Sequence, residues 1–280
     1  MVHHLTMVEW INLTLMKTNI KYIAMTLLVV FNFSFTQKEN AAFKFRQQNN
    51  KAFGFGEQLT YRVHYGWWNA ARLTMRVDDT VVSVGERPTY HIVASGKTNK
   101  SFDWMYTVRD RFESYVDTSG IAPLKYFKTV QEDKYKDTDL VYYDHEGKKL
   151  RGLKKNMDMP EYVQDIVSGT YYARTIDFSK AYVGQTFPLD IYLDQKIYNL
   201  KFKYLGIETI KSDFGKVRCI KLRPQLVVDR VFKDEDDMTI WVSDDGNRLP
   251  IRVQTDIWVG PLKVDLTSYK GLANPFDAKL

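Results

Sequence analysis

Apolar and polar side chains alternate along most of the chain at the two-residue spacing of β-strands. The first clear run begins at Leu59 and similar runs return as far as Leu266, separated by short turn sequences such as residues 144–147 and 244–247. Helices do not alternate with the strands, which argues against a parallel sheet. The pattern therefore predicts an all-β fold, in which roughly a dozen antiparallel strands form a half-barrel, a barrel or a sandwich.

One segment departs from this pattern and predicts a helix over residues 158–175. Asp158 is a suitable N-cap, Pro160 suits the first turn, and Glu161 has the spacing of a capping box. The residues that follow at helical spacing are Val163, Ile166, Val167, Thr170 and Tyr171. A glycine inside a helix costs about 1 kcal/mol relative to alanine. We therefore interpret Gly169 as a close approach of a neighbouring backbone, and expect a central helix that covers the concave face of the sheet with protein on two sides. The alternative is a surface helix with a tolerated glycine.

The N-terminus has the pattern of a secretory signal peptide. Lys17 and Lys21 precede an apolar run of 14 residues, 22–35, and Ser34 and Thr36 are small residues before a cut at position 37. The run is too short for a comfortable membrane span. We interpret residues 1–36 as a signal peptide with an upstream extension, and expect an exported protein that is periplasmic or extracellular and soluble after cleavage.

The remaining chain is predicted to hold one domain. Residues 37–52 are polar and indicate a flexible leader, residues 53–272 form a single β-rich domain, and residues 273–280 form a C-terminal tail. Cleavage removes two lysines and one glutamate and leaves a formal charge of +5, too weakly basic for a nucleic-acid-binding protein. Cys219 is the only cysteine, so no internal disulfide can form, and its strand pattern predicts burial.

Short motifs along the domain indicate a family. They are Gly56-Glu57-x-Leu59-x-Tyr61, Arg109-Asp110-x-x-Glu113-Ser114-Tyr115, Gln164-Asp165-x-x-Ser168-x-x-Tyr171-Tyr172-x-Arg174, Arg223-Pro224, Trp241-x-x-Asp244-Asp245 and Pro250. With these motifs, residues 53–271 resemble the exported bacterial proteins of the domain of unknown function 3108 family. The resemblance implies no activity, because none is established for that family. The overall plan is also similar to the periplasmic half-barrels of lipoprotein carriers, a likeness of architecture alone.

No catalytic or metal-binding motif stands out. Ser168 lies inside the predicted helix and not on a strand-to-helix elbow, so a structural role is favoured. His64, His91 and His145 have no histidine partner at the spacing of a zinc site. We therefore expect no catalytic residue, no metal, no cofactor and no enzymatic activity.

Four charged residues are predicted to form a structural polar cluster that fixes the helix to the sheet. Asp110 and Asp165 lie among aromatic residues and are costly to bury unless paired, and Arg109 and Arg174 are available partners. The alternative is a set of exposed pairs, each worth less than about 1 kcal/mol. The same two aspartates and Glu57 support a second alternative, a carboxylate-based hydrolase, if two of them converge in a cleft.

The leading functional hypothesis is an exported, non-enzymatic cell-envelope protein that binds a lipid, an envelope glycan or another amphipathic ligand between the curved sheet and the helix. Candidate ligand contacts are Tyr61, Trp104, Tyr171 and Tyr172. The alternative is a structural or interaction protein of the envelope, with a filled core and an envelope protein as its partner.

Two surface features predict peripheral contact with a membrane. Trp67 and Trp68 lie at a predicted hairpin tip, and Lys148 and Lys149 begin a basic segment. Tryptophan is enriched at membrane interfaces, and lysine binds anionic headgroups. The alternative is that the tryptophans pack inward and the lysines are solvated.

Overall fold

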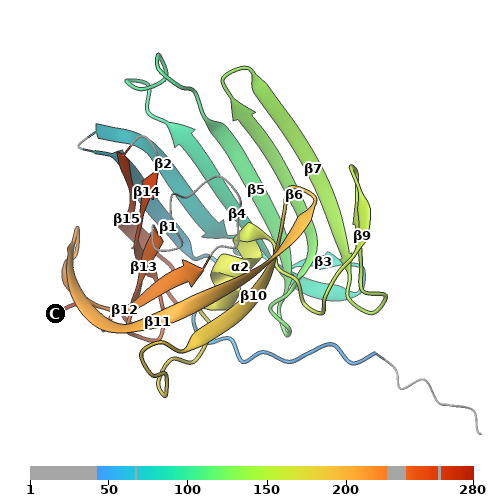
Figure 1. Cartoon of the computed structure of the whole chain (residues 1–280). Helices are drawn as coiled ribbons and strands as arrows, with labels where there is room; N and C mark the ends of the chain where they lie inside the picture. Colours follow the sequence, from blue (N-terminus) through green and yellow to red (C-terminus); the bar gives the residue numbers. More distant parts are fainter. Residues whose placement is uncertain (1–42, 67, 226–237, 258–259) are drawn as a thin grey trace, which may run out of the picture. The chain divides into compact units, whose positions relative to one another are not determined.

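The computed structural model describes residues 43–66, 68–225, 238–257 and 260–280 (Figure 1). Its contacts divide the chain into two compact units, Met1–Lys44 and Phe45–Leu280. The second unit holds every element discussed below. The predicted signal peptide and residues 37–42 lie outside the described residues.

The described part of the second unit contains 15 β-strands and the single helix α2 (Ile166–Ala173). The strands are β1 (Gln58–Tyr65), β2 (Trp68–Val77), β3 (Val82–Val84), β4 (Arg87–Thr98), β5 (Arg109–Asp117), β6 (Pro123–Glu132), β7 (Tyr135–Asp144), β8 (Lys149–Gly152), β9 (Asn156–Asp158), β10 (Thr186–Leu193), β11 (Lys196–Ser212), β12 (Gly215–Gln225), β13 (Met238–Ser243), β14 (Pro250–Ile257) and β15 (Gly260–Lys270).

All the strands belong to one antiparallel sheet. Its order is β10-β11-β12-β13-β14-β15-β1-β2-β4-β5-β6-β7-β8-β9, with β3 paired to β4 outside this path. The pairing of β15 with β1 puts the last strand beside the first in the middle of the sheet. The two edges, β9 and β10, are therefore the strands on either side of α2 in the sequence. The predicted all-β fold with an antiparallel meander is confirmed, and the sheet stays open instead of closing into a barrel.

Helix α2 begins later than predicted. Asp158 ends β9, and Tyr162 has a positive φ of 58°, which a helix does not allow. The backbone of Gln164 pairs with β10, where its N–H donates to Asp190 O (2.9 Å) and its O accepts from Tyr192 N–H (2.7 Å). The predicted cap at Asp158, with Pro160 and Glu161, is therefore wrong, because strand pairing holds this segment extended. The N-cap is Asp165.

Protein surrounds α2 on two sides, as predicted. Val167 and Tyr171 are buried in a core shared with the central strands, and α2 contacts β4 and β5 on one side and β10 on the other. A Cβ at Gly169 would lie 2.6 Å from Ile191 Cδ1 of β10. The close neighbour is thus the Ile191 side chain, and not a backbone as expected.

Segments outside the sheet pack onto it. Phe45 and Ala52 are buried, and Arg46 Nε and Nη2 donate to Gly120 O (2.7 Å) and Ile121 O (2.9 Å). Near the C-terminus, Ala278 is buried. Residues 45–52 of the predicted leader and residues 273–280 of the predicted tail thus belong to the second unit and contribute buried side chains to it.

Candidate functional site

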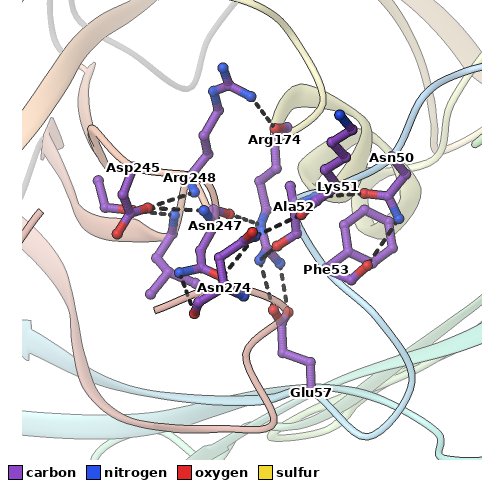
Figure 2. Close-up of polar contacts among 12 residues, drawn as sticks. Asn50, Lys51, Ala52, Phe53, Glu57, Arg174, Asp245, Asn247, Arg248 and Asn274 are labelled. Carbon is purple, nitrogen blue, oxygen red and sulfur yellow. Dashed lines mark hydrogen bonds and ion pairs between the residues drawn. The ribbon is translucent and has the colours of Figure 1, made fainter. Parts of the chain in front are cut away.

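A buried ion pair lies at the C-terminal end of α2. Arg174, the C-cap residue, donates from Nη1 and Nη2 to Glu57 Oε1 and Oε2 at 2.6 and 2.7 Å (Figure 2). Its Nε donates to Asn247 O and its Nη2 to Ala52 O, both at 3.0 Å. The side chains are 2% and 0% exposed for Arg174 and Glu57. One guanidinium therefore joins α2 to the segment before β1 and to the β13–β14 turn.

The contacts continue to the C-terminal segment. Asn247 Nδ2 donates to the carbonyl oxygens of Asn274 (3.0 Å) and Pro275 (2.9 Å), and Asn274 Nδ2 donates to Lys51 O (2.7 Å). Asp245 Oδ1 accepts from Asn247 N–H (3.0 Å) and shapes the turn (Figure 2). We call Glu57, Arg174, Asn247 and Asn274 the polar hub. The hub fills this end of the concave face with protein groups.

The surroundings of the hub favour the charged form of Arg174. Burial alone would lower the pKa of Arg174, but the hydrogen bonds and charge of Glu57 outweigh it and raise that pKa. Tyr61 and Tyr171 are buried beside the pair, and burial raises the pKa of both hydroxyls. The hub is thus a structural element, in which removal of one charge leaves the other unsolvated.

The predicted polar cluster does not form. Arg109 pairs with Asp103 (2.6 Å), and Asp110 accepts from Gln131 N–H (3.0 Å). Asp165 bonds to serine and to its own helix, while Arg174 pairs with Glu57. The prediction that helix and sheet are joined by Asp–Arg pairs is therefore wrong in its partners. Glu57 stands in the Gly56-Glu57 motif, but the sequence pattern alone could not connect it with Arg174, 117 residues away.

Asp165 is a fully buried cap. Its Oδ1 accepts from the N–H groups of Val167 and Ser168, both at 2.8 Å, and its Oδ2 accepts from Ser114 Oγ (2.6 Å) of β5. Ser168 Oγ in turn accepts from Asp165 N–H (2.9 Å), which completes a capping box. Burial raises the pKa of Asp165 from 3.8 to about 6, against the lowering effect of these hydrogen bonds.

Replacing Asp165 by asparagine is expected to change how stability depends on pH. Because the folded-state pKa is raised from 3.8 to about 6, the folded protein binds more protons between these values, and the free energy of unfolding falls as the pH rises through them. Asparagine does not titrate, but its oxygen can still cap the helix. Relative to this variant, the wild type should lose up to about 1.4 kcal/mol per pH unit. Urea unfolding from pH 3.5 to 7 measures this, and parallel curves for the two proteins would contradict it.

The three carboxylates of the hydrolase alternative have separate structural partners. Glu57 is held by Arg174, Asp165 caps α2, and Asp110 accepts from the β6 backbone. Within the described ranges, no group of three or more His, Cys, Asp and Glu side chains is placed to hold a metal ion. Cys219 is buried in β12, as predicted.

Three of the four predicted ligand contacts pack in one core, and the fourth lies apart from them. Tyr61 and Tyr171 are packed in the core beside the hub. Trp104 is 82% exposed in the segment between β4 and β5. Tyr172 is partly buried against the same core, and its ring lies 4.6 Å from the Arg46 guanidinium. Tyr61, Tyr171 and the polar hub are buried between helix and sheet at this end, so a ligand site between helix and sheet stays a prediction.

The predicted membrane contacts are also separated. Trp67 lies outside the described residues. Trp68 is 53% exposed at the start of β2, at the end of the sheet where β7 also begins. Lys148 and Lys149 follow the other end of β7 and form ion pairs with Glu161 and Asp158. The tryptophan and lysines thus lie at opposite ends of the strands and form no single membrane-facing surface.

An apolar row crosses the concave face beyond the hub. Its members are paired across five adjacent strands, and consist of Ile240, Val253, Val264, Val63 and Ala71. On the three central strands, the residues two positions away from the row are Ile251, Leu266 and Tyr61, which are buried in the core with α2. Because residues two apart in a strand share a face, the row lies on the same face as α2. All five members of the row are only partly buried. We call this set the concave apolar row, and it is the candidate binding surface.

The fold and this surface define a class of protein: an open antiparallel half-barrel with an internal helix and an apolar concave face. The chain belongs to the family described as protein of unknown function (DUF3108), whose model matches residues 60–267. This confirms the resemblance found in the sequence motifs. A search of curated proteins returns no match.

Several solved structures match the chain at low identity. A β-barrel-like DUF1849 protein from Brucella abortus is 8% identical, with coverage of 78% of this chain and 98% of that chain and a TM-score of 0.47. A protein with a YmcC-like fold from Bacteroides fragilis is 11% identical, with 80% and 100% coverage and a TM-score of 0.32. The lipoprotein LppX from Mycobacterium tuberculosis is 8% identical, with 80% and 90% coverage and a TM-score of 0.15. In the part of the chain that the structure describes, no helix has the length and hydropathy needed to cross a bilayer.

Proposed function

We propose that the protein is an exported, non-enzymatic component of the cell envelope that binds an amphipathic molecule on its concave face. The observation that carries this proposal is the concave apolar row, where apolar side chains of five paired strands stay partly exposed. The predicted signal peptide supports export. Apolar side chains favour the acyl chain of a lipid over an envelope glycan, because their contact with a lipid removes hydrocarbon from water.

The proposed ligand position differs from the space between α2 and the sheet. Tyr171 and the polar hub fill that space, so the ligand would lie across β13, β14, β15, β1 and β2 on the side away from Arg174. Each Å² of apolar surface covered there would contribute roughly 25 cal/mol. Binding on this surface needs no cofactor.

A charge placed in the row should weaken lipid binding. Val253→Lys puts an ammonium group on the concave face, where contact with an acyl chain would desolvate it. We expect at least about a tenfold weaker affinity for a fluorescent fatty acid, equivalent to about 1.4 kcal/mol. Gln254→Lys is the matched control, because the next residue of β14 faces the opposite side of the sheet.

Two measurements decide the outcome. Native mass spectrometry and lipid extraction of the purified protein should detect a co-purifying lipid in the wild type and a reduced amount in Val253→Lys. Equal affinity of both lysine variants and the wild type for the probe, together with an extract free of lipid, would contradict the proposal.

A second candidate function is a structural or interaction protein of the envelope. The observation that favours it is the filled space around α2, where the hub joins both terminal segments to the sheet. Co-purification of an envelope protein from detergent extracts, with no bound lipid, would support this candidate over lipid binding.

A further inference from the structure

Four cations lie in one line across the convex face of the sheet. They are directly paired from strand to strand: Arg62 of β1 with Arg72 of β2, Arg72 with Lys97 of β4, and Lys97 with Arg109 of β5. These strands are neighbours in the sheet (Figure 1). Like charges directly opposite each other destabilise a sheet. A negative charge near these three successive like-charged pairs would therefore reduce their repulsion and stabilise the sheet.

Acidic side chains of the protein form ion pairs with only two of the four cations. Arg62 pairs with Asp213 (2.9 Å) and Arg109 with Asp103 (2.6 Å). Arg72 and Lys97, the two central members, are exposed and form no ion pair with any described residue. The middle of the line is thus where an external anion would be stabilised most.

The next line of residues on the same face has small hydroxyl side chains. Thr74 of β2 is paired with Ser95 of β4, and Ser95 is paired with Arg111 of β5. The short side chains leave a hollow of about 390 Å³ between the cations, lined by Arg72, Thr74, Ser95, Lys97, Arg109 and Arg111. This volume lies within the range of about 300–1,000 Å³ that is common for small-molecule sites.

One acid also borders the hollow. Asp110 accepts a hydrogen bond from Gln131 N–H (3.0 Å), and burial raises the pKa of its carboxyl group. Glu113 accepts from Arg111 Nε (2.7 Å) and from a ring nitrogen of His91 (2.7 Å). Four cations line the hollow, Arg72, Lys97, Arg109 and Arg111. With Asp110, Glu113 and the Arg109 partner Asp103 all ionised, three negative charges oppose them and the hollow keeps a net positive charge.

We propose that this hollow is a binding site for the phosphate group of a small molecule or a lipid headgroup. Guanidinium groups bind phosphate oxygens through paired, charge-assisted hydrogen bonds, and lysine adds a compact positive charge. Thr74 and Ser95 also line the hollow and add hydroxyl donors. The site lies on the opposite face from the concave apolar row, so it does not depend on lipid binding there.

Three variants of the full mature chain test the proposal. Arg72→Gln/Lys97→Gln removes the two unpaired cations, and Ser95→Leu fills the hollow without changing the charge. Lys136→Gln/Lys196→Gln removes two exposed lysines elsewhere and is the control for net charge. Binding is measured calorimetrically with glycerol 3-phosphate and inorganic phosphate, and by sedimentation with phosphatidylglycerol and phosphatidylcholine vesicles.

The expected result is binding of a soluble phosphate or of phosphatidylglycerol vesicles that weakens at least about tenfold in both hollow variants and less than about twofold in the control. Binding of the soluble compounds identifies a small-molecule source, and binding of vesicles alone identifies a lipid headgroup. The melting temperature of Arg72→Gln/Lys97→Gln should equal or exceed that of the wild type, because the repulsion is relieved.

Three outcomes would overturn the proposal. The first is a wild type that binds neither the soluble phosphates nor phosphatidylglycerol. The second is unchanged binding by Ser95→Leu, which would show a diffuse electrostatic surface and no role for the hollow. The third is equal weakening in the control variant, which would show dependence on net charge alone.

Discussion

Replacing Arg174 by methionine is expected to lower the free energy of unfolding by about 3–5 kcal/mol. Methionine fills much of the same volume but leaves the Glu57 carboxylate buried without its bidentate partner. The carbonyl oxygens of Ala52 and Asn247 also lose a donor. Urea unfolding followed by tryptophan fluorescence would measure the loss.

Two further variants separate the causes of this loss. The double variant Glu57→Gln/Arg174→Met no longer buries an unpaired charge, so it should recover part of the stability that the single variant loses. Arg151→Met removes the exposed pair with Asp144 and should cost less than about 1 kcal/mol. A loss of the same small size in Arg174→Met would show that the hub does not fix α2.

Replacing Gly271 by alanine is expected to cost about 2–5 kcal/mol. Gly271 has a φ of 65°, and a Cβ there would lie 2.4 Å from Gly56 O. The left-handed backbone costs an alanine roughly 1–2 kcal/mol, and overpacking typically adds about 1–3 kcal/mol. Because Gly56 precedes Glu57, the displaced backbone would also disturb the ion pair with Arg174. Thermal and urea unfolding would measure the effect.

Gly85→Ala is the matched control for this variant. Gly85 has a similar φ of 59°, but nothing lies within 4 Å of the position of its Cβ. This variant should show only the backbone strain, roughly 1–2 kcal/mol. Equal losses for the two alanine variants would mean that the close approach to Gly56 contributes nothing to stability.

Much of the strand content could be predicted from the sequence, because each strand carries its own alternation. The start of the helix could not. Asp158 and Asp165 are both suitable N-caps. The helix begins after Asp165 because the backbone N–H and C=O of Gln164 are hydrogen-bonded to β10 and cannot join a helix. Serine at position 168 completes the actual capping box in place of the expected glutamate. Local helix propensity cannot reveal that strand pairing with β10, far along the chain, competes with helix formation here.

The candidate sites depend on strand register, which a single sequence does not reveal. Arg72 and Lys97 stand on the polar side of their strands, but only the pairing of β2 with β4 places them opposite each other. Val63 and Tyr61 lie on the same face of β1, yet Val63 is partly exposed and Tyr61 lies in the core. Glu57 likewise meets Arg174 only because the sheet curves around α2.

The pairing of β1 with β15 has a consequence for the order of folding. A chain that emerges with its N-terminus first can form the strand pairs from β1 to β9 early. The pairing of β1 with β15 in the middle of the sheet can form only after the final strand has emerged. Contacts between residues so far apart in sequence close slowly. Until β15 has emerged, the nascent polypeptide lacks the pairing that joins the two halves of the sheet. A partly folded chain of this kind is compatible with passage through a narrow translocation channel.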